Sequence, residues 1–157
     1  MKDTHKFWDE SVEYYDEAES TGTPLSSNPA LQKLFDNIKP YDKVLDVGCG
    51  EGSKIRDAYS RVPDIEAYGV DISGLALGRA TEKHPDICFL PSDIEELEFV
   101  NDYFDVVYST YVFEHTTNPL GVLREMIRVT KPGGKVIIVC PNYGSPIYTS
   151  PITPKFN

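Results

Sequence analysis

Residues 44–52 read Val-Leu-Asp-Val-Gly-Cys-Gly-Glu-Gly and combine an apolar run with a glycine at every second position. The apolar residues before Gly48 predict a buried strand, and the glycines predict a turn directly after it. Because glycine has no Cβ and tolerates positive φ, a bound molecule can lie against the bare backbone of such a turn. The helix-like stretch 51–61 follows, so its free N–H groups would point at whatever occupies the turn.

Asp46 is a carboxylate inside this apolar strand, two residues before the first glycine. Burying a carboxylate is costly unless hydrogen bonds or charges satisfy it. We therefore expect Asp46 to brace the glycine turn by accepting backbone N–H bonds.

Two ligand classes use a glycine-rich turn after the first strand of an α/β sheet. Dinucleotides favour G-x-G-x-x-G, with the pyrophosphate on the helix N-terminus. Here Gly52 comes one residue early, and Glu51 would repel a pyrophosphate. A cationic or zwitterionic ligand suits this turn better, and a nicotinamide dinucleotide is the alternative.

A second acidic residue, Asp71, ends another strand-like run. A carboxylate at the end of the second strand can accept hydrogen bonds from both ribose hydroxyls of a nucleoside. Proteins that bind NAD use the same feature, so Asp71 indicates a nucleoside without separating the two ligand classes.

The elements that must position these residues alternate between strand and helix along the chain. We expect strands at 42–48, 66–71, 87–90, 104–109 and 135–140, helices at 51–61, 73–83 and 118–129, and a short helical turn at 95–101. Another helix is expected to run from Asn28, as N-cap, and Pro29 to about Ile38. This alternation predicts one α/β domain with a parallel sheet and right-handed crossovers.

The string from Asp46 to Gly52, with its preceding strand, resembles the first motif of the class I S-adenosylmethionine-dependent methyltransferases. The resemblance extends from about residue 30 to residue 142, and further segments of that family follow in the same order. These segments are Gly69–Ser73, Pro91–Ile94, Phe104–Ser109 with Tyr111–His115, and Arg128–Lys135. The resemblance implies a Rossmann-like three-layer sandwich with a mostly parallel sheet. It also implies an enzyme that transfers a methyl group from S-adenosyl-L-methionine to a small-molecule acceptor.

The resemblance also implies roles for individual residues. The glycines of the turn would contact the amino-acid half of the cofactor, Asp71 the ribose, and Asp93 with Ile94 the adenine. His115 is the best candidate for a catalytic base, and the alternative is that it only shapes the loop before the next helix. The implied cofactor-binding set is Asp46, Gly48, Cys49, Gly50, Gly52, Asp71, Ile72, Asp93, Ile94, Ser109 and Tyr15.

Residues 5–19 have helical character, with Trp8, Val12 and Tyr15 near one face. This face either packs on the sheet and its helices or, as in relatives of the family, closes over the cofactor as a lid. In the second case Trp8, Tyr14 or Tyr15 would lie near the sulfonium.

The family sheet has seven strands, and this sequence stops before the last two. We expect a methyltransferase domain over 1–142, with 1–27 as an N-terminal helix and loop, and a proline-rich tail over 143–157. Either the chain is a fragment of a longer protein or the missing strands come from elsewhere. Because an open apolar edge at 136–139 invites pairing, we expect a second copy, forming a homodimer, or the tail itself to cover it.

The chain has 157 residues and a formal net charge of −10, with three cysteines that are not spaced like a zinc site. The acidic balance argues against a nucleic-acid partner and an anionic membrane surface, and it favours a neutral or cationic acceptor. No apolar run is long enough to span a bilayer or to form a signal peptide, so we expect a cytoplasmic protein. No metal site is expected.

Functional alternatives are a cofactor-binding fragment without turnover and a nicotinamide-dependent oxidoreductase.

Overall fold

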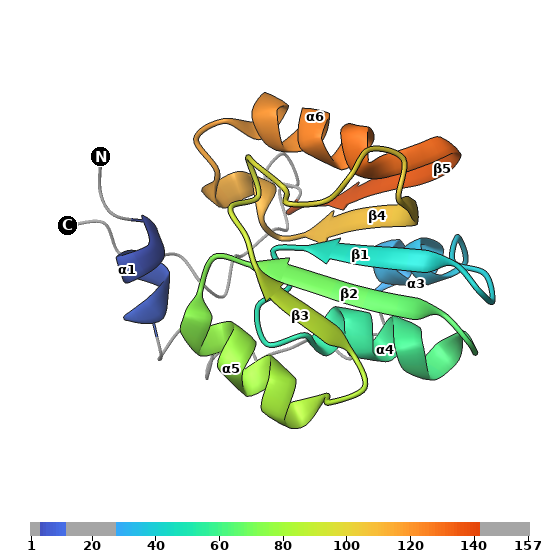
Figure 1. The fold of residues 1–157 in the computed structure, drawn as a ribbon, viewed down its shortest axis with the longest axis horizontal. Coiled ribbons are helices and arrows are strands. Elements are labelled where there is room, and N and C mark those ends of the chain that lie inside the picture. The colour runs from blue at the N-terminus through green and yellow to red at the C-terminus, as the bar shows by residue number, and fades with distance from the viewer. Residues whose placement is uncertain (1–3, 12–27, 142–157) are drawn as a thin grey trace.

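The computed structural model describes residues 4–11 and 28–141, and for residues 4 and 5 only the backbone. Its centre is a parallel sheet of five strands in the order β3-β2-β1-β4-β5 (Figure 1). The strands are β1 (Lys43–Val47), β2 (Glu66–Asp71), β3 (Cys88–Pro91), β4 (Phe104–Thr110) and β5 (Thr130–Val139). This order confirms the expected Rossmann-like α/β fold, in which the chain returns to the middle of the sheet between β3 and β4.

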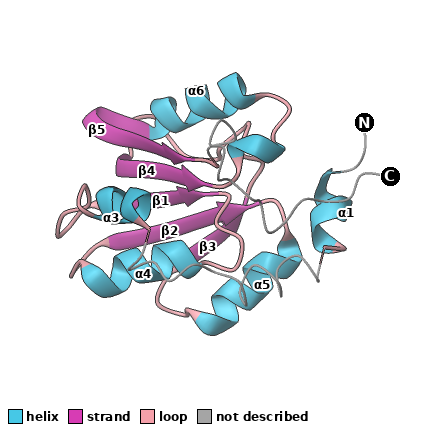
Figure 2. Cartoon of the chain, turned by 180° about the vertical axis from the view of Figure 1, so that it is seen from behind, coloured by secondary structure: helices cyan, strands magenta, loops and turns pink. Residues whose placement is uncertain are grey.

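Helices cover both faces of the sheet. The helices α4 (Ser53–Arg61) and α5 (Gly74–Lys83) lie on one side and α6 (Pro119–Val129) lies on the other (Figure 1). The view from behind shows α3 (Pro29–Phe35) on the same side as α4 (Figure 2). The short helix α1 (Thr4–Asp9) lies beyond the carboxyl ends of the strands (Figure 1), and a single 3₁₀ turn, η2 (Phe113–His115), follows β4.

The two-sided cover explains why Val44, Leu45 and Val47 of β1 are all apolar. Val44 packs into the core cluster shared with α3 and α4, whereas Leu45 and Val47 pack into the cluster shared with α6. Alternate residues of a strand point to opposite faces, so a central strand between two helical layers has no solvent-facing side. A charged residue at position 46 is therefore as deeply buried as its apolar neighbours.

Side-chain caps start three of the helices as their sequences indicate. Asn28 Oδ1 accepts hydrogen bonds from the N–H groups of Ala30 and Leu31, which confirms the predicted start of α3 at Pro29. Ser73 caps α5 and Asn118 caps α6 in the same way.

Three expected elements differ in the structure. Residues 95–101 form turns instead of a helical turn, because the backbone there bonds to side chains of α6. The N-terminal helix ends at Asp9 within the described part, and residues 12–19 of the expected helix lie outside it. The last strand begins at Thr130, earlier than expected. Its first ladder pair is Phe104–Thr130 and the next is Val106–Lys135, so residues 131–134 form a bulge in the pairing with β4.

The strand β5 lies at one edge of the sheet, and within the described residues it pairs only with β4. The tail at 143–157 lies outside the described residues. Among the helices that are described, none combines the length and apolarity needed to cross a membrane.

Candidate cofactor and acceptor site

A cavity of about 610 Å³ opens past the carboxyl ends of β1, β2 and β4. Its size falls in the range typical of small-molecule sites. Parallel strands collect the loops that follow them at one edge of the sheet, which is where ligands bind in such folds. Eight of the residues predicted from the sequence line it, and they are Gly48, Cys49, Gly50, Asp71, Ile72, Asp93, Ile94 and His115.

The glycine turn forms the inner wall of this cavity. Gly48 and Gly50 have φ values of 77° and 52°, a backbone region that side chains disfavour. A Cβ on Gly48 would lie 3.0 Å from Cγ1 of Val112 and closer still to its Cγ2, so the turn needs glycine there for space as well. The N–H groups of Gly48 and Cys49 both donate to the Val70 carbonyl, at 2.8 and 2.9 Å, and fix the turn on β2. The wall is therefore bare backbone in a rigid shape.

Asp71 is the carboxylate that braces the turn. Its Oδ2 accepts from the N–H of Gly50 at 2.8 Å, and its Oδ1 accepts from the N–H of Ser73 at 2.9 Å. Burial raises the pKa of Asp71, and these backbone hydrogen bonds oppose the rise. Each carboxylate oxygen has a second lone pair, so Asp71 can still accept two further hydrogen bonds from a ligand in the cavity.

Asp46 does not have the bracing role expected of it. Its side chain is fully buried, lies outside the cavity lining, and neither of its oxygens meets hydrogen-bond geometry with a described residue. Burial raises the pKa of Asp46 to about 7, and the nearby Tyr108 hydroxyl and Lys54 only partly offset this. Tyr108 is its neighbour in the β1–β4 ladder, so the pair forms a buried polar layer beneath the turn.

Two other predicted binding residues have structural roles in this geometry. Gly52 lies outside the lining, and a Cβ there would come within 2.6 Å of the Phe89 ring, so packing explains this glycine. Ser109 is fully buried and donates its hydroxyl to the Val47 carbonyl at 2.8 Å, which ties β4 to β1. Tyr15 lies outside the described residues.

Glu51, within the turn, faces the helix α5. Its carboxylate forms ion pairs with Arg79 at 2.7 Å and Lys83 at 2.6 Å. Burial alone would raise the pKa of Glu51, but these two cations outweigh it and the pKa is lowered. The ion pairs fasten the second half of the turn to α5.

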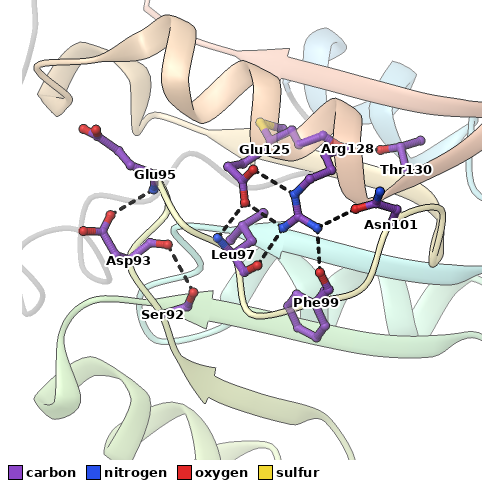
Figure 3. Close-up of polar contacts among 10 residues, drawn as sticks. Ser92, Asp93, Glu95, Leu97, Phe99, Asn101, Glu125, Arg128 and Thr130 are labelled. Atoms are coloured by element: carbon purple, nitrogen blue, oxygen red, sulfur yellow. Dashed lines mark hydrogen bonds and ion pairs between the residues drawn. The ribbon is translucent and has the colours of Figure 1, made fainter.

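The loop after β3 carries Asp93 and Ile94 to the cavity and is held from behind by α6 (Figure 3). Arg128 donates to the carbonyls of Leu97 and Phe99, both at 2.7 Å, and its Nε donates to Glu125. Glu125 also accepts from the N–H of Leu97 at 2.9 Å. These bonds take the place of the helical turn expected at 95–101.

The outer rim is built by segments distant in sequence. Trp8 lines the cavity, and its ring meets the edge of the His115 ring at a centroid distance of 5.4 Å. Asp9, the last residue of α1, accepts from the Ser73 hydroxyl at 3.0 Å and from the N–H of Leu75 at 3.2 Å. The helix α1 is thus docked on the start of α5, and its Trp8 lines the cavity.

Several lining residues were not identified from the sequence. Lys54, Arg56, Lys83 and His84 line the side of the cavity formed by α4 and the end of α5. No motif marks them, since Lys54 and Arg56 come from α4 whereas Lys83 and His84 come from the end of α5, and only the fold brings them to one cavity. Thr116 and Thr117 join the rim from the segment after η2.

The donor and acceptor groups of this cavity fit a nucleoside. Asp71 and Asp93 offer carboxylates, the turn offers bare backbone, and Lys54, Arg56 and Lys83 add cations to the lining.

Comparisons with known proteins agree with this geometry. A family model described as a methyltransferase domain matches residues 45–138. The chain is 33% identical over 99 residues to a demethylmenaquinone methyltransferase of Renibacterium salmoninarum, covering 63% of this chain and 41% of that protein. It is 33% identical over 134 residues to phosphoethanolamine N-methyltransferase 1 of Triticum aestivum, covering 81% of this chain and 26% of that protein.

Among solved structures, an S-adenosylmethionine-dependent methyltransferase from Mesorhizobium loti superposes with a TM-score of 0.64 at 26% identity, covering 73% of this chain and 54% of that one. The chain spans less than half the length of the two curated relatives named above.

Proposed function

Because the chain belongs to the class I S-adenosylmethionine-dependent methyltransferases, we propose that it transfers a methyl group from S-adenosyl-L-methionine to a small-molecule acceptor. The observation that carries the proposal is the inner wall of the cavity. There the bare backbone of Gly48 and Gly50 lies beside a carboxylate, Asp71, that keeps lone pairs for a ligand. Family membership argues against the nicotinamide-dependent oxidoreductase.

Different residues of the cavity would contact different parts of the cofactor. Gly48 and Gly50 would lie against its amino-acid half, Asp71 would accept the ribose hydroxyls, and Asp93 with Ile94 would hold the adenine. When bound, the cofactor supplies a methyl group activated by a sulfonium leaving group. The chain's own contribution is to hold both reactants close together and to exclude water, for which Trp8 is placed at the rim.

His115 is the candidate base within this proposal. It lines the cavity at the rim and contacts Trp8, so it lies on the side where an acceptor would enter. An oxygen or nitrogen acceptor that must lose a proton could pass it to the imidazole. We expect His115→Gln to lower turnover of such an acceptor while leaving cofactor affinity unchanged.

The relatives indicate a small organic acceptor but differ in its chemical class. The similar proteins are named for demethylmenaquinone and phosphoethanolamine, which differ in charge and in the atom that would receive the methyl group. We propose a small organic acceptor, tested by incubating the protein with S-adenosylmethionine and a panel of phenols, quinols and amines. Formation of S-adenosylhomocysteine that depends on an added acceptor supports the proposal. Cofactor binding without turnover on any panel member favours the alternative of a cofactor-binding fragment.

We also propose that a second copy of this chain covers the free edge of β5. Within the described residues β5 pairs only with β4, and Ile138 on this strand is 36% exposed. Unpaired backbone beside exposed apolar side chains favours strand pairing. Light scattering on the purified chain is expected to give a dimer, and a stable monomer would contradict the pairing.

A further inference from the structure

Tyr111 has an unusual backbone conformation at the carboxyl end of β4. Its φ is 59°, in the left-handed region that residues with a Cβ avoid. Its N–H donates to the Val139 carbonyl at 2.8 Å, so the adjacent strand β5 holds the residue in place. Four non-glycine residues in the described part have positive φ (Tyr41, Asp64, Asp102 and Tyr111), and of these Tyr111 alone lines the cavity. Strain of this kind persists where surrounding structure enforces it and is common at functional sites.

The Tyr111 hydroxyl has a defined hydrogen-bond direction. Its oxygen accepts from Nδ2 of Asn28 at 2.9 Å. The Asn28 amide cannot turn around, because its Oδ1 already accepts from the N–H groups of Ala30 and Leu31 as the cap of α3. Asn28 therefore presents a donor to Tyr111, and the phenol must use its own proton elsewhere. Within the described residues no acceptor takes that proton.

The surroundings of Tyr111 indicate what could receive this proton. Tyr111 shares the cavity with Trp8, Val112 and Ile94, which offer aromatic and aliphatic surface. Tyr111 lines the cavity and is 36% exposed, so a ligand there can reach its side chain. A carbon-rich molecule would pack on these side chains, and an oxygen on that molecule would satisfy the phenol.

We propose that Tyr111 selects the acceptor by donating its hydroxyl proton to an oxygen of a carbon-rich acceptor, with Asn28 fixing the direction of that bond. The proposal deepens the proposed function and rests on it. It assigns the acceptor to molecules that carry a ketone, quinone or phenolate oxygen, and it disfavours acceptors whose only polar group is an ammonium, because an ammonium cannot accept a hydrogen bond.

The test uses two probes of nearly equal shape, 1-tetralone and tetralin, which differ by one carbonyl oxygen. The full chain, saturated with S-adenosylhomocysteine, is titrated with each probe by calorimetry. Trp8 is the only tryptophan in the sequence and lines the cavity, so its fluorescence reports occupancy independently. We expect the wild type to bind 1-tetralone at least about fivefold more tightly than tetralin, the effect of one neutral hydrogen bond.

Two variants decide whether Tyr111 causes this preference. Tyr111→Phe removes the hydroxyl, and we expect it to bind both probes equally. Asn28→Asp keeps an oxygen to cap α3 but replaces the donor by a second acceptor, so the Tyr111 proton turns towards the new carboxylate. It should remove the preference as completely as Tyr111→Phe, whereas Asn28→Ser, which also keeps the cap, should retain part of it.

A wild type without preference, a Tyr111→Phe variant that keeps it, or an Asn28→Asp variant that keeps it would overturn the proposal. Calorimetry with S-adenosylhomocysteine alone tests the proposed function separately. If the chain does not bind that compound, the two probes are titrated without it, and the same variants decide the role of Tyr111.

Discussion

The inner wall and the outer rim of the cavity are held by different kinds of contact. On the inner wall, Gly48, Gly50 and Asp71 are fixed by backbone hydrogen bonds to the sheet and to each other. On the rim, the side chains of Trp8 and Tyr111 are held by side chains from distant segments, through the Trp8–His115 ring contact and the Asn28–Tyr111 hydrogen bond. A wall made of backbone can bind the same ligand in many sequences, whereas a rim made of side chains can change its ligand with a few substitutions. The comparison teaches that cofactor binding and acceptor choice are separable in this molecule.

The largest effect on cofactor affinity is expected from Gly48→Ala. The substitution places a Cβ against Val112 and requires an unfavourable backbone conformation, so the turn must move. We expect cofactor binding to become undetectable by calorimetry and the free energy of unfolding to fall by about 2–4 kcal/mol.

Gly133→Ala is the matched control for that change. Gly133 has a similar φ of 80°, but its Cβ would meet nothing within 4 Å. It therefore carries the backbone cost alone, about 1–2 kcal/mol, and should bind cofactor normally. If Gly133→Ala lost cofactor affinity as well, a general loss of stability, and not the shape of the glycine turn, would explain the effect of Gly48→Ala.

Asp71→Asn is expected to have the next largest effect. An amide keeps only one acceptor oxygen, so either Gly50 or Ser73 would lose its partner and face an NH₂ group. We expect cofactor affinity to fall about 100-fold, equivalent to one or two hydrogen bonds to a charged group. Asp86→Asn removes the same charge from an exposed position and should leave affinity unchanged. Equal losses in both variants would show that charge alone, and not the brace, matters.

A smaller effect is expected from Arg128→Lys, since Arg128 holds the loop that carries Asp93. Lysine cannot bridge Glu125 and the carbonyls of Leu97 and Phe99 together, so the loop that carries Asp93 should loosen. We expect a loss of about 1–2 kcal/mol in stability and a decrease of about threefold to tenfold in cofactor affinity, measured by urea unfolding and calorimetry. Arg124→Lys, on the exposed side of α6, is the control. An unchanged affinity in Arg128→Lys would show that this loop does not contribute to the wall.

Asp46→Asn should leave cofactor affinity unchanged and alter only the pH dependence of stability. The pKa of Asp46 is raised to about 7 in the folded chain, so the folded state holds a proton that the unfolded state releases above about pH 4. Asp46 therefore reduces stability progressively as the pH rises from about 4 to about 7, by roughly 2–4 kcal/mol in total. Asparagine carries no charge that burial would penalise. The stability of the variant relative to the wild type should therefore increase from about pH 4 to about pH 7. A constant difference between the two at every pH would contradict the buried neutral carboxyl.

The sequence predicted the wall better than the rim, for physical reasons. The glycine turn and the Asp71 position follow from local rules, because a strand, a turn and a helix in succession leave few alternatives. The wrong expectation for Asp46 came from reading a buried carboxylate as a brace, when Asp71 on the next strand has that role. Gly52 and Ser109 were assigned to binding, but they serve packing against Phe89 and a hydrogen bond to Val47.

The rim depends on contacts between residues far apart in the chain, which no local sequence pattern predicts. Asn28 was predicted as a helix cap, and it is one, but its bond to Tyr111 joins residues 83 positions apart. The left-handed conformation of Tyr111 has no signature in its residue type, since tyrosine rarely adopts it. Lys54 and Arg56 of α4 and His84 at the end of α5 likewise meet at the cavity only in the folded chain.

The central claim, that the wall binds a sulfonium nucleoside, is tested most directly by calorimetry of the wild type with S-adenosylmethionine, S-adenosylhomocysteine and NAD in parallel. The account predicts saturable one-to-one binding of the first two, lost in Gly48→Ala and kept in Gly133→Ala, with no heat from NAD. Binding of NAD in their place, or equal binding of the nucleosides by both glycine variants, would contradict it.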